Sequence, residues 1–144
     1  MCIIIDINVL PKAFDEGKED FSLIRKAISD GHAIIVCGGR LRREYIRMRR
    51  YSSLFTELER AGRYKSFSDE EVDREEQLIE SQCRSDDAHI VALARIARAR
   101  LLCSEDVLLH EDFTNPILLT KPRGKIYRND SHHDLLRNAC KLCR

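Results

Sequence analysis

Short runs of branched apolar residues alternate with amphipathic segments along the first part of the chain. One run, residues 2–6, ends on a carboxylate, and a second covers residues 32–37. Between them, residues 21–31 place apolar side chains at helical spacing and end at a glycine. A strand, a helix and a second strand in this order predict parallel pairing with a right-handed crossover.

The same two patterns continue to the C-terminus. They predict helices over residues 40–50, 53–61, 69–80, 86–99 and 131–143, strands within residues 100–106 and 116–120, and a brief extended piece within residues 121–127. Ser68 and Glu71 form a capping box at the start of the helix predicted over residues 69–80. The helix predicted over residues 86–99 is apolar on almost all sides, as is typical of a buried helix. The alternation predicts an α/β fold with an α/β/α sandwich architecture.

Length and composition favour one domain spanning residues 1–144. The chain has 43% hydrophobic and 34% charged residues, enough for one compact core. The apolar start of the chain gives way at once to Asp6, so it lacks the apolar region of a signal peptide. No apolar run approaches the roughly 20 residues that span a bilayer. We therefore expect a soluble, cytoplasmic protein with no membrane segment.

The chain contains six cysteines, and four of them lie in or beside apolar stretches: Cys2, Cys37, Cys83 and Cys103. These four are expected to be small core residues in a reducing compartment. Cys140 and Cys143 have metal-ligand spacing, and His132 and His133 would complete a zinc site. Because no second Cys-x-x-Cys pair is present, we favour buried or terminal thiols over zinc.

Charge is segregated along the chain although the net charge is only +1. Residues 40–65 hold nine Arg or Lys against three Glu, and residues 69–80 hold seven acids against one Arg. The basic residues that share a helix with Glu44 are Arg40, Arg42, Arg43, Arg47, Arg49 and Arg50. These arginines are candidates for contacts with a phosphate backbone, the alternative being a solvated surface of mixed sign. The acidic helix is expected to be a solvated face, or else to cover a basic groove or dock a partner.

Carboxylates follow two of the predicted strands. Asp6 and Asp106 each end an apolar strand, and the carboxyl ends of parallel strands line one crevice. The buried helix at 86–99 begins with Asp86 and Asp87, so it aims a third acid at the same rim. Glu44 lies about 60° from the centre of the apolar stripe of its helix, at the edge of the buried face.

Grouping such acids is costly, because two like charges 4 Å apart repel by about 4 kcal/mol at an effective dielectric constant near 20. Either raised pKa values or a hard dication must offset the repulsion. Mg²⁺ or Mn²⁺ in such a site polarises a phosphoryl oxygen and lowers the pKa of a bound water. The acids therefore favour metal-assisted hydrolysis of phosphodiesters.

Four segments in this order resemble the motifs of the PIN-domain ribonucleases. They are D-I-N-V-L at 6–10, L-R-R-E-Y at 41–45, D-D-A-H-I-V-A-L-A at 86–94 and L-L-C-S-E-D at 101–106. The resemblance covers most of the chain, and the order and spacing of the motifs carry it, since each motif alone is weak. The long acidic helix at 69–80 and the basic C-terminal extension depart from the family's usual pattern.

The resemblance implies a PIN-like sandwich with a five-stranded parallel sheet and an endoribonuclease that uses Mg²⁺ or Mn²⁺ on single-stranded or structured RNA. It assigns the metal and the catalysis to Asp6, Glu44, Asp87 and Asp106, with Asp112 as a further metal-binding acid and with Asn8 and Ser104 as supporting residues. If the substrate is RNA, the arginines of the Glu44 helix that we expect to contact its backbone are Arg40, Arg42, Arg43 and Arg47. It also implies a toxin of a toxin–antitoxin pair, an antitoxin partner and a homodimer, since these are frequent among short family members.

Other interpretations stay open for single residues and for the whole chain. Asp6, Asp87, Ser85 and Ser104 could each cap a helix, and His89 and His110 are expected to be packing or surface residues rather than general bases. Haloacid-dehalogenase-like phosphatases also carry an acid after the first strand, but they have a second Asp where this chain has Asn8. A catalytically silent PIN-like module that binds RNA or protein is the remaining alternative.

Overall fold

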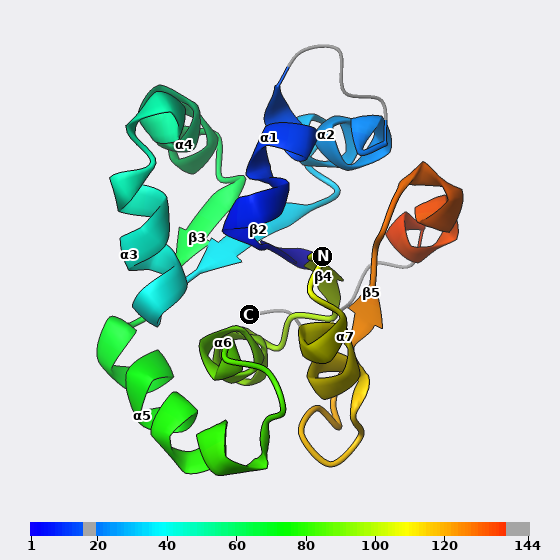
Figure 1. Ribbon diagram of the computed structural model, residues 1–144. Helices are drawn as coiled ribbons and strands as arrows, with labels where there is room; N and C mark the ends of the chain where they lie inside the picture. Colours follow the sequence, from blue (N-terminus) through cyan, green and yellow to red (C-terminus); the bar gives the residue numbers. More distant parts are fainter. Residues whose placement is uncertain (16–19, 138–144) are drawn as a thin grey trace.

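A five-stranded, all-parallel sheet runs through the centre of the molecule (Figure 1). The computed structural model describes residues 1–15 and 20–137. The order of the strands in the sheet is β3-β2-β1-β4-β5. Their bounds are β1 Cys2–Ile5, β2 Ile34–Cys37, β3 Tyr64–Ser66, β4 Leu101–Cys103 and β5 Lys125–Ile126. The predicted fold class, an α/β sandwich around a parallel sheet of five strands, is confirmed.

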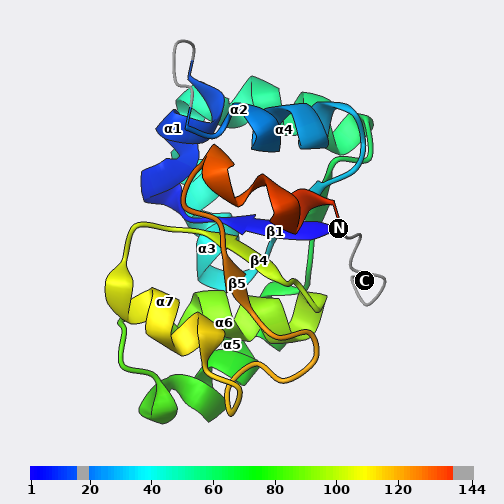
Figure 2. The ribbon, with the colours of Figure 1, turned by 90° about the vertical axis from the view of Figure 1, so that its right-hand side faces the viewer.

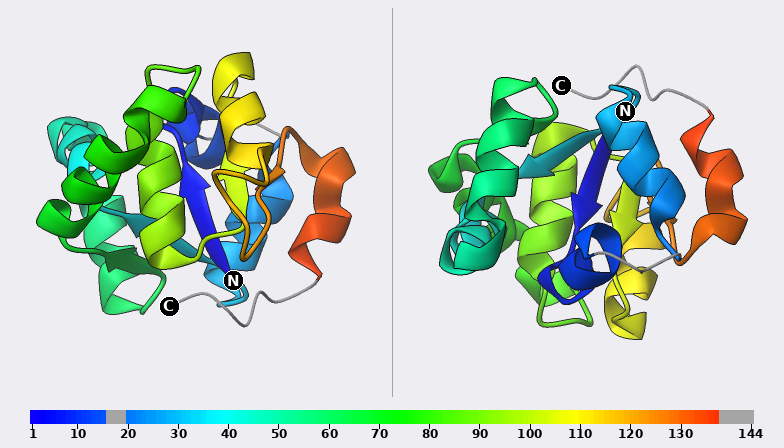
Figure 3. Two further views of the ribbon diagram at one scale, coloured as in Figure 1. Left: turned by 90° about the horizontal axis from the view of Figure 1, so that it is seen from below. Right: turned by 90° about the horizontal axis from the view of Figure 1, so that it is seen from above.

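Helices cover both faces of the sheet. The α-helices are α1 Leu10–Phe14, α2 Ser22–Ser29, α3 Gly39–Arg47, α4 Ser52–Arg60, α5 Asp69–Ile79, α6 Ala88–Ala97 and α7 Val107–Thr114. Short 3₁₀ helices cover Ile7–Val9, Arg49–Tyr51, Glu80–Gln82 and Asp130–Leu136. Figure 2 shows the sheet between α1, α2 and α4 above and α5, α6 and α7 below, and the two views of Figure 3 show each helical layer in front of the strands. The arrangement is a three-layer sandwich.

The core is centred on β1 and α6. All four residues of β1 are buried, because this strand has a paired neighbour on each side and a helical layer on each face. Eight of the ten residues of α6 are buried, as its nearly uniform apolar sequence predicts. The predicted helices at 21–31, 40–50, 53–61, 69–80 and 86–99 are all present, with ends that differ by a few residues.

Outside this core one predicted strand is wrong, the extended piece predicted within residues 121–127 is confirmed, and one strand was missed. Residues 116–120 form a turn rather than a strand, because the side chain of Asn115 accepts a hydrogen bond from Ile117 N and its carbonyl accepts from Leu118 N and Leu119 N. The fifth strand is instead the extended piece at Lys125–Ile126. The third strand, Tyr64–Ser66, was not predicted, since it is a short edge strand with mostly exposed side chains.

The C-terminal segment differs from the predicted helix over residues 131–143. The chain forms a 3₁₀ helix at Asp130–Leu136, in which Leu135 and Leu136 are half-buried against the core. The rest of the predicted helix lies outside the described residues. Cys2 is disulfide-bonded, so the prediction of a thiol there is wrong, whereas Cys37, Cys83 and Cys103 are free. Within residues 1–15 and 20–137, no helix has the length and apolarity to cross a bilayer.

Candidate functional site

Asp6 and Asp106 follow neighbouring parallel strands, β1 and β4. Ile5 is in register with Cys103, and Asp6 N donates to Cys103 O at 2.9 Å. Ser104 connects the two acids, because its Oγ donates to Asp6 Oδ2 at 2.8 Å and accepts from Asp106 N at 3.2 Å. The predicted proximity of the two strand-end acids is therefore confirmed.

The Asp6 carboxylate is buried, with only 7% of the residue exposed. Burial raises the pKa of Asp6, hydrogen bonds from Ser104 and from the backbone of Ile7 lower it, and the nearby charge of Asp106 raises it further. The net shift is upward from the ordinary value. Asp6 precedes a 3₁₀ helix, but its side chain makes no capping bond there. A capping role therefore does not explain this buried acid.

Asp87 is the third acid of the group. It precedes α6, and its side chain also makes no capping bond to that helix. Burial, the charge of Asp6 and the interaction with the Asp106 carboxyl together raise the pKa of Asp87 from 3.8 to about 6. Asp106 differs from both, because its Oδ1 caps α7 by accepting from Leu108 N at 3.0 Å. The structure thus brings Asp6, Asp87 and Asp106 together and gives one of them a capping role as well.

Glu44 lies on α3, next to this group. Its side chain is 18% exposed, at the edge of the buried face as its helical position predicts. Oε1 lies 3.2 Å from Arg40 Nε in an i,i+4 ion pair, and Oε2 lies 3.7 Å from His89 Nε2 on α6. His89 connects Glu44 to Asp87, because its Nδ1 lies 4.0 Å from Asp87 Oδ1.

Arg40 is the cation that faces these acids. Its charge lowers the pKa values of both Asp6 and Asp87, and its Nη1 donates to the carbonyl of Asp86 at 3.4 Å. The guanidinium therefore offsets part of the repulsion that the sequence predicted for grouped carboxylates. The Arg40 side chain is 48% exposed, so solvent screens part of its interaction with these acids.

Asp112 and Asn8 are placed differently from the acids above. Asp112 is buried, and its two oxygens accept from Arg84 N and Ser85 N at 2.9–3.0 Å. It thus holds the segment that leads to Asp87. Asn8 is exposed, and in the described part of the chain its side chain makes no hydrogen bond, so it does not support any of the acids in this way. The sequence held no signal that separated Asp112 from the strand-end acids.

Two of the arginines expected to face RNA instead contact the acidic helix. Arg42 Nη1 lies 3.1 Å from Asp69 Oδ2, and Arg43 forms a two-pronged pair with Asp73 at 2.9 and 3.1 Å. The start of α3 is fixed to the same helix, since the N–H of Gly39 donates to Asp69 at 2.9 Å. The prediction that helix 69–80 is mainly a solvated face is wrong on this side, because the helix covers part of the basic cluster.

Arg47 lies at the end of α3. It is exposed, and no ion pair to it occurs among residues 1–15 and 20–137. Its charge is therefore available to a ligand, in contrast to those of Arg42 and Arg43.

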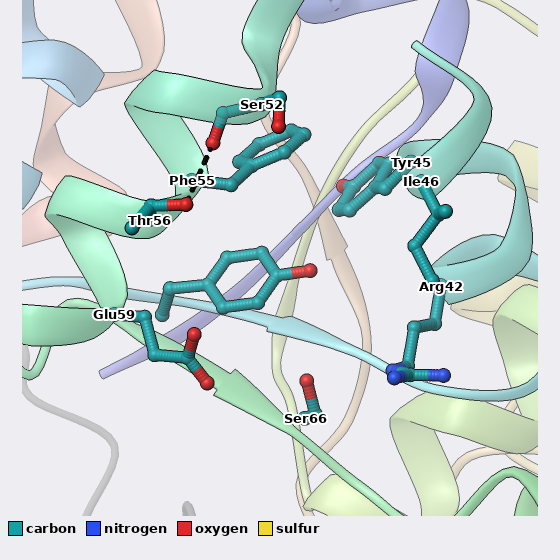
Figure 4. A pocket seen from close by; sticks show the side chains of 9 residues that line it. Arg42, Tyr45, Ile46, Ser52, Phe55, Thr56, Glu59 and Ser66 are labelled. Carbon is teal, nitrogen blue, oxygen red and sulfur yellow. Dashed lines mark hydrogen bonds between the residues drawn. The ribbon is translucent and has the colours of Figure 1, made fainter. Parts of the chain in front are cut away.

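A pocket of about 230 Å³ lies between α3, α4 and β3 (Figure 4). The rings of Tyr45, Phe55 and Tyr64 line it, with Tyr45 and Phe55 stacked at 4.9 Å between centroids. The Tyr45 hydroxyl donates to the carbonyl of Ile5, so this ring forms a wall between the pocket and β1. None of the grouped acids lines this pocket.

Comparisons with protein-family models, with curated proteins and with solved structures find no match to the chain. The resemblance to PIN domains therefore depends on the sequence motifs alone.

The donor set of the site fits a hard dication in kind. Carboxylate oxygens are the ligands that Mg²⁺ and Mn²⁺ prefer. Burial raises the pKa values of Asp6 and Asp87, so their negative charges are unfavourable in the fold, and a bound cation would offset that cost. Among the residues described, no three or more His, Cys, Asp or Glu side chains are already arranged as a metal-binding group. A cation would therefore have to draw the carboxylates together.

The raised pKa of Asp87 has a measurable consequence for stability without metal. A carboxyl whose pKa is about 6 in the folded state and 3.8 otherwise stabilises the fold below pH 4, and this contribution is lost as the pH rises through 6. Since 26% of the side chain is exposed, we expect a loss of about 1 kcal/mol between pH 4.5 and 7.

The measurement is urea unfolding in EDTA of the wild type and of Asp87→Asn at both pH values. The free energy of unfolding of the wild type relative to the variant should fall with rising pH. A difference that stays constant or increases with pH would contradict the assignment.

Proposed function

We propose that this protein is a divalent-metal-dependent endoribonuclease that hydrolyses RNA phosphodiester bonds. The observation that carries the proposal is the convergence of Asp6, Asp87 and Asp106 at the carboxyl ends of β1 and β4 and the start of α6. The side chains of Asp6 and Asp87 do not cap the helices that they precede, and the pKa of each is raised. Such energetically costly groups are concentrated at functional sites.

Mg²⁺ or Mn²⁺ would be held by Asp6, Glu44, Asp87 and Asp106, and when bound it supplies Lewis acidity and a water of lowered pKa. Ser104 keeps the Asp6 carboxylate oriented through a buried hydrogen bond. Asp106 is held at the same time by its bonds to the first turn of α7, so its free oxygen faces a fixed direction. The chain thereby presents its acids from rigid elements, as an efficient site requires.

Arg40, Arg42, Arg43 and Arg47 are the residues we assign to the RNA backbone. Arg47 offers an uncommitted charge at the exposed end of α3. Arg42 and Arg43 would exchange Asp69 and Asp73 for phosphates, since surface ion pairs of this kind contribute only about 0.2–1 kcal/mol each. Binding should therefore weaken steeply with salt.

The test is cleavage of a fluorescently labelled RNA that contains single-stranded loops. We expect products with Mg²⁺ or Mn²⁺ and none with EDTA, and activity should return when metal is added back in excess. Cleavage that proceeds equally well in EDTA would eliminate the metal mechanism.

A catalytically silent module is the second candidate. It is favoured by one observation, the lack of an already assembled metal-binding group among the described residues. Salt-dependent RNA binding without cleavage at any metal concentration would support it against the nuclease. The toxin role, an antitoxin partner and a homodimer stay predictions from the resemblance, and an adjacent reading frame for a small partner protein would be the first thing to look for.

A further inference from the structure

His89 lies inside the molecule, and among residues 1–15 and 20–137 its ring has no hydrogen-bond partner. Only 1% of the residue is exposed. Buried polar atoms are almost always paired, so an unpaired imidazole in the core needs an explanation, and a missing ion is one. If His89 served packing alone, an apolar side chain of similar size would make the folded protein more stable.

The two ring nitrogens of His89 face two acids of the candidate site. Nε2 lies 3.7 Å from Glu44 Oε2, and Nδ1 lies 4.0 Å from Asp87 Oδ1. Both separations are too long for hydrogen bonds. Two ligand atoms that share one metal, each about 2.1 Å from it, lie up to about 4.2 Å apart. The gap between Nε2 and Glu44 is therefore wide enough for a shared dication.

We propose that His89 Nε2 and Glu44 Oε2 form a binding position for a first-row transition-metal dication, in which His89 Nδ1–H would donate a hydrogen bond to Asp87 once the metal is bound. A carboxylate that holds the second nitrogen of a ligating histidine is the usual companion of such sites, because it fixes the tautomer and the ring orientation. This inference rests on the proposed function, since Glu44 and Asp87 belong to the same site. It adds a nitrogen ligand to a set otherwise made of oxygens.

The nitrogen ligand bears on which metal the site selects. Imidazole binds transition metals well, whereas Mg²⁺ prefers oxygen ligands and keeps its waters. The lone pair of the His89 ring is free to bind a metal, because neither ring nitrogen makes a hydrogen bond to the described residues. Arg40 contacts Oε1 of Glu44, which leaves Oε2 for the metal. We therefore expect Mn²⁺ to bind more tightly than Mg²⁺.

Electron spin echo spectroscopy of bound Mn²⁺ tests the proposal directly, without reference to catalysis. The wild-type protein with Mn²⁺ should show modulation from a coordinated ¹⁴N nucleus, and labelling with ¹⁵N-histidine should change its frequency. His89→Asn should lose the imidazole modulation and bind Mn²⁺ about tenfold or more weakly, while Mg²⁺ binding changes less. The matched control is His32→Asn, at an exposed position, which should keep the signal.

The wild-type isotope experiment keeps the proposal falsifiable even if His89→Asn fails to fold. Bound Mn²⁺ without histidine nitrogen modulation would overturn the role of His89 and leave the nuclease proposal untouched. A signal that survives in His89→Asn but disappears in His32→Asn would overturn it as well. Failure of the nuclease proposal has a different signature, namely Mn²⁺ bound through His89 with no RNA cleavage under any condition.

Discussion

Asp6→Asn is expected to reduce RNA cleavage by about 1000-fold, because the loss of one charged metal ligand removes several kcal/mol of transition-state stabilisation and 1.36 kcal/mol corresponds to tenfold. The amide oxygen of Asn can still accept the hydrogen bond from Ser104 that Asp6 accepts at 2.8 Å. The substitution therefore removes charge with little change in shape. The measurement is the initial cleavage rate with saturating Mg²⁺ or Mn²⁺.

The same variant should be more stable than the wild type when metal is absent. Burial and the charge of Asp106 both raise the pKa of Asp6, so its negative charge is unfavourable in the folded state. Thermal unfolding in EDTA should give a higher midpoint for Asp6→Asn, and added metal should stabilise the wild type more than the variant. Activity lost together with a lower midpoint would mean that Asp6 is structural.

Asp30→Asn is the matched control for this experiment. Asp30 is an exposed residue at the end of α2, so the same chemical change there should alter neither the cleavage rate nor the response to metal. If both variants lose activity to the same extent, the effect is one of net charge on RNA binding rather than of the acid site.

Asp6 and Asp106 could be predicted from the sequence because two physical rules depend only on the local pattern and on parallel pairing. A buried run that ends in a carboxylate marks the end of a central strand, and parallel strands align such ends. The pairing of β1 with β4 and the bond from Ser104 to Asp6 confirm this reasoning. The position of Asp87 follows in the same way from a helix that must pack on the sheet with its apolar side chains.

The edges of the sheet could not be predicted by the same rules. Tyr64–Ser66 is a strand of three residues with two exposed side chains, so neither alternation nor a buried run marks it. The apolar residues Leu118 and Leu119 did suggest a strand, but they are buried from a turn that Asn115 stabilises. Short apolar runs are ambiguous in this way, since burial alone does not fix the backbone conformation.

Contacts between distant segments were the other limit. The basic run and the acidic run were both visible in the sequence, yet their pairing through Arg42 and Arg43 depends on α5 lying against α3. His89 was expected to be a packing or a surface residue, and the structure places it in the buried interior. Its position between Glu44 and Asp87 is set by α3 and α6 together. The sequence held no local signal for it, except that His89 is polar where the other buried residues of α6 are apolar.

Asp112→Ala is expected to lower the free energy of unfolding by about 3 kcal/mol, because the part-buried N–H of Arg84 and the buried N–H of Ser85 would lose a charged acceptor. The loss should be seen in EDTA as well as in the presence of metal. Urea unfolding under both conditions measures it. Asp112→Asn keeps one acceptor oxygen and should lose less.

The neighbouring acid provides the matched control for Asp112. Glu111 is exposed and pairs with the side chain of Arg84 at the surface, so Glu111→Ala should change stability by no more than about 0.5 kcal/mol. If Asp112 were instead a metal ligand, as the resemblance implies, Asp112→Ala would weaken metal binding and leave the metal-free protein as stable as the wild type. The two roles therefore predict opposite results in EDTA, and the three backbone hydrogen bonds of Asp112 favour the structural one.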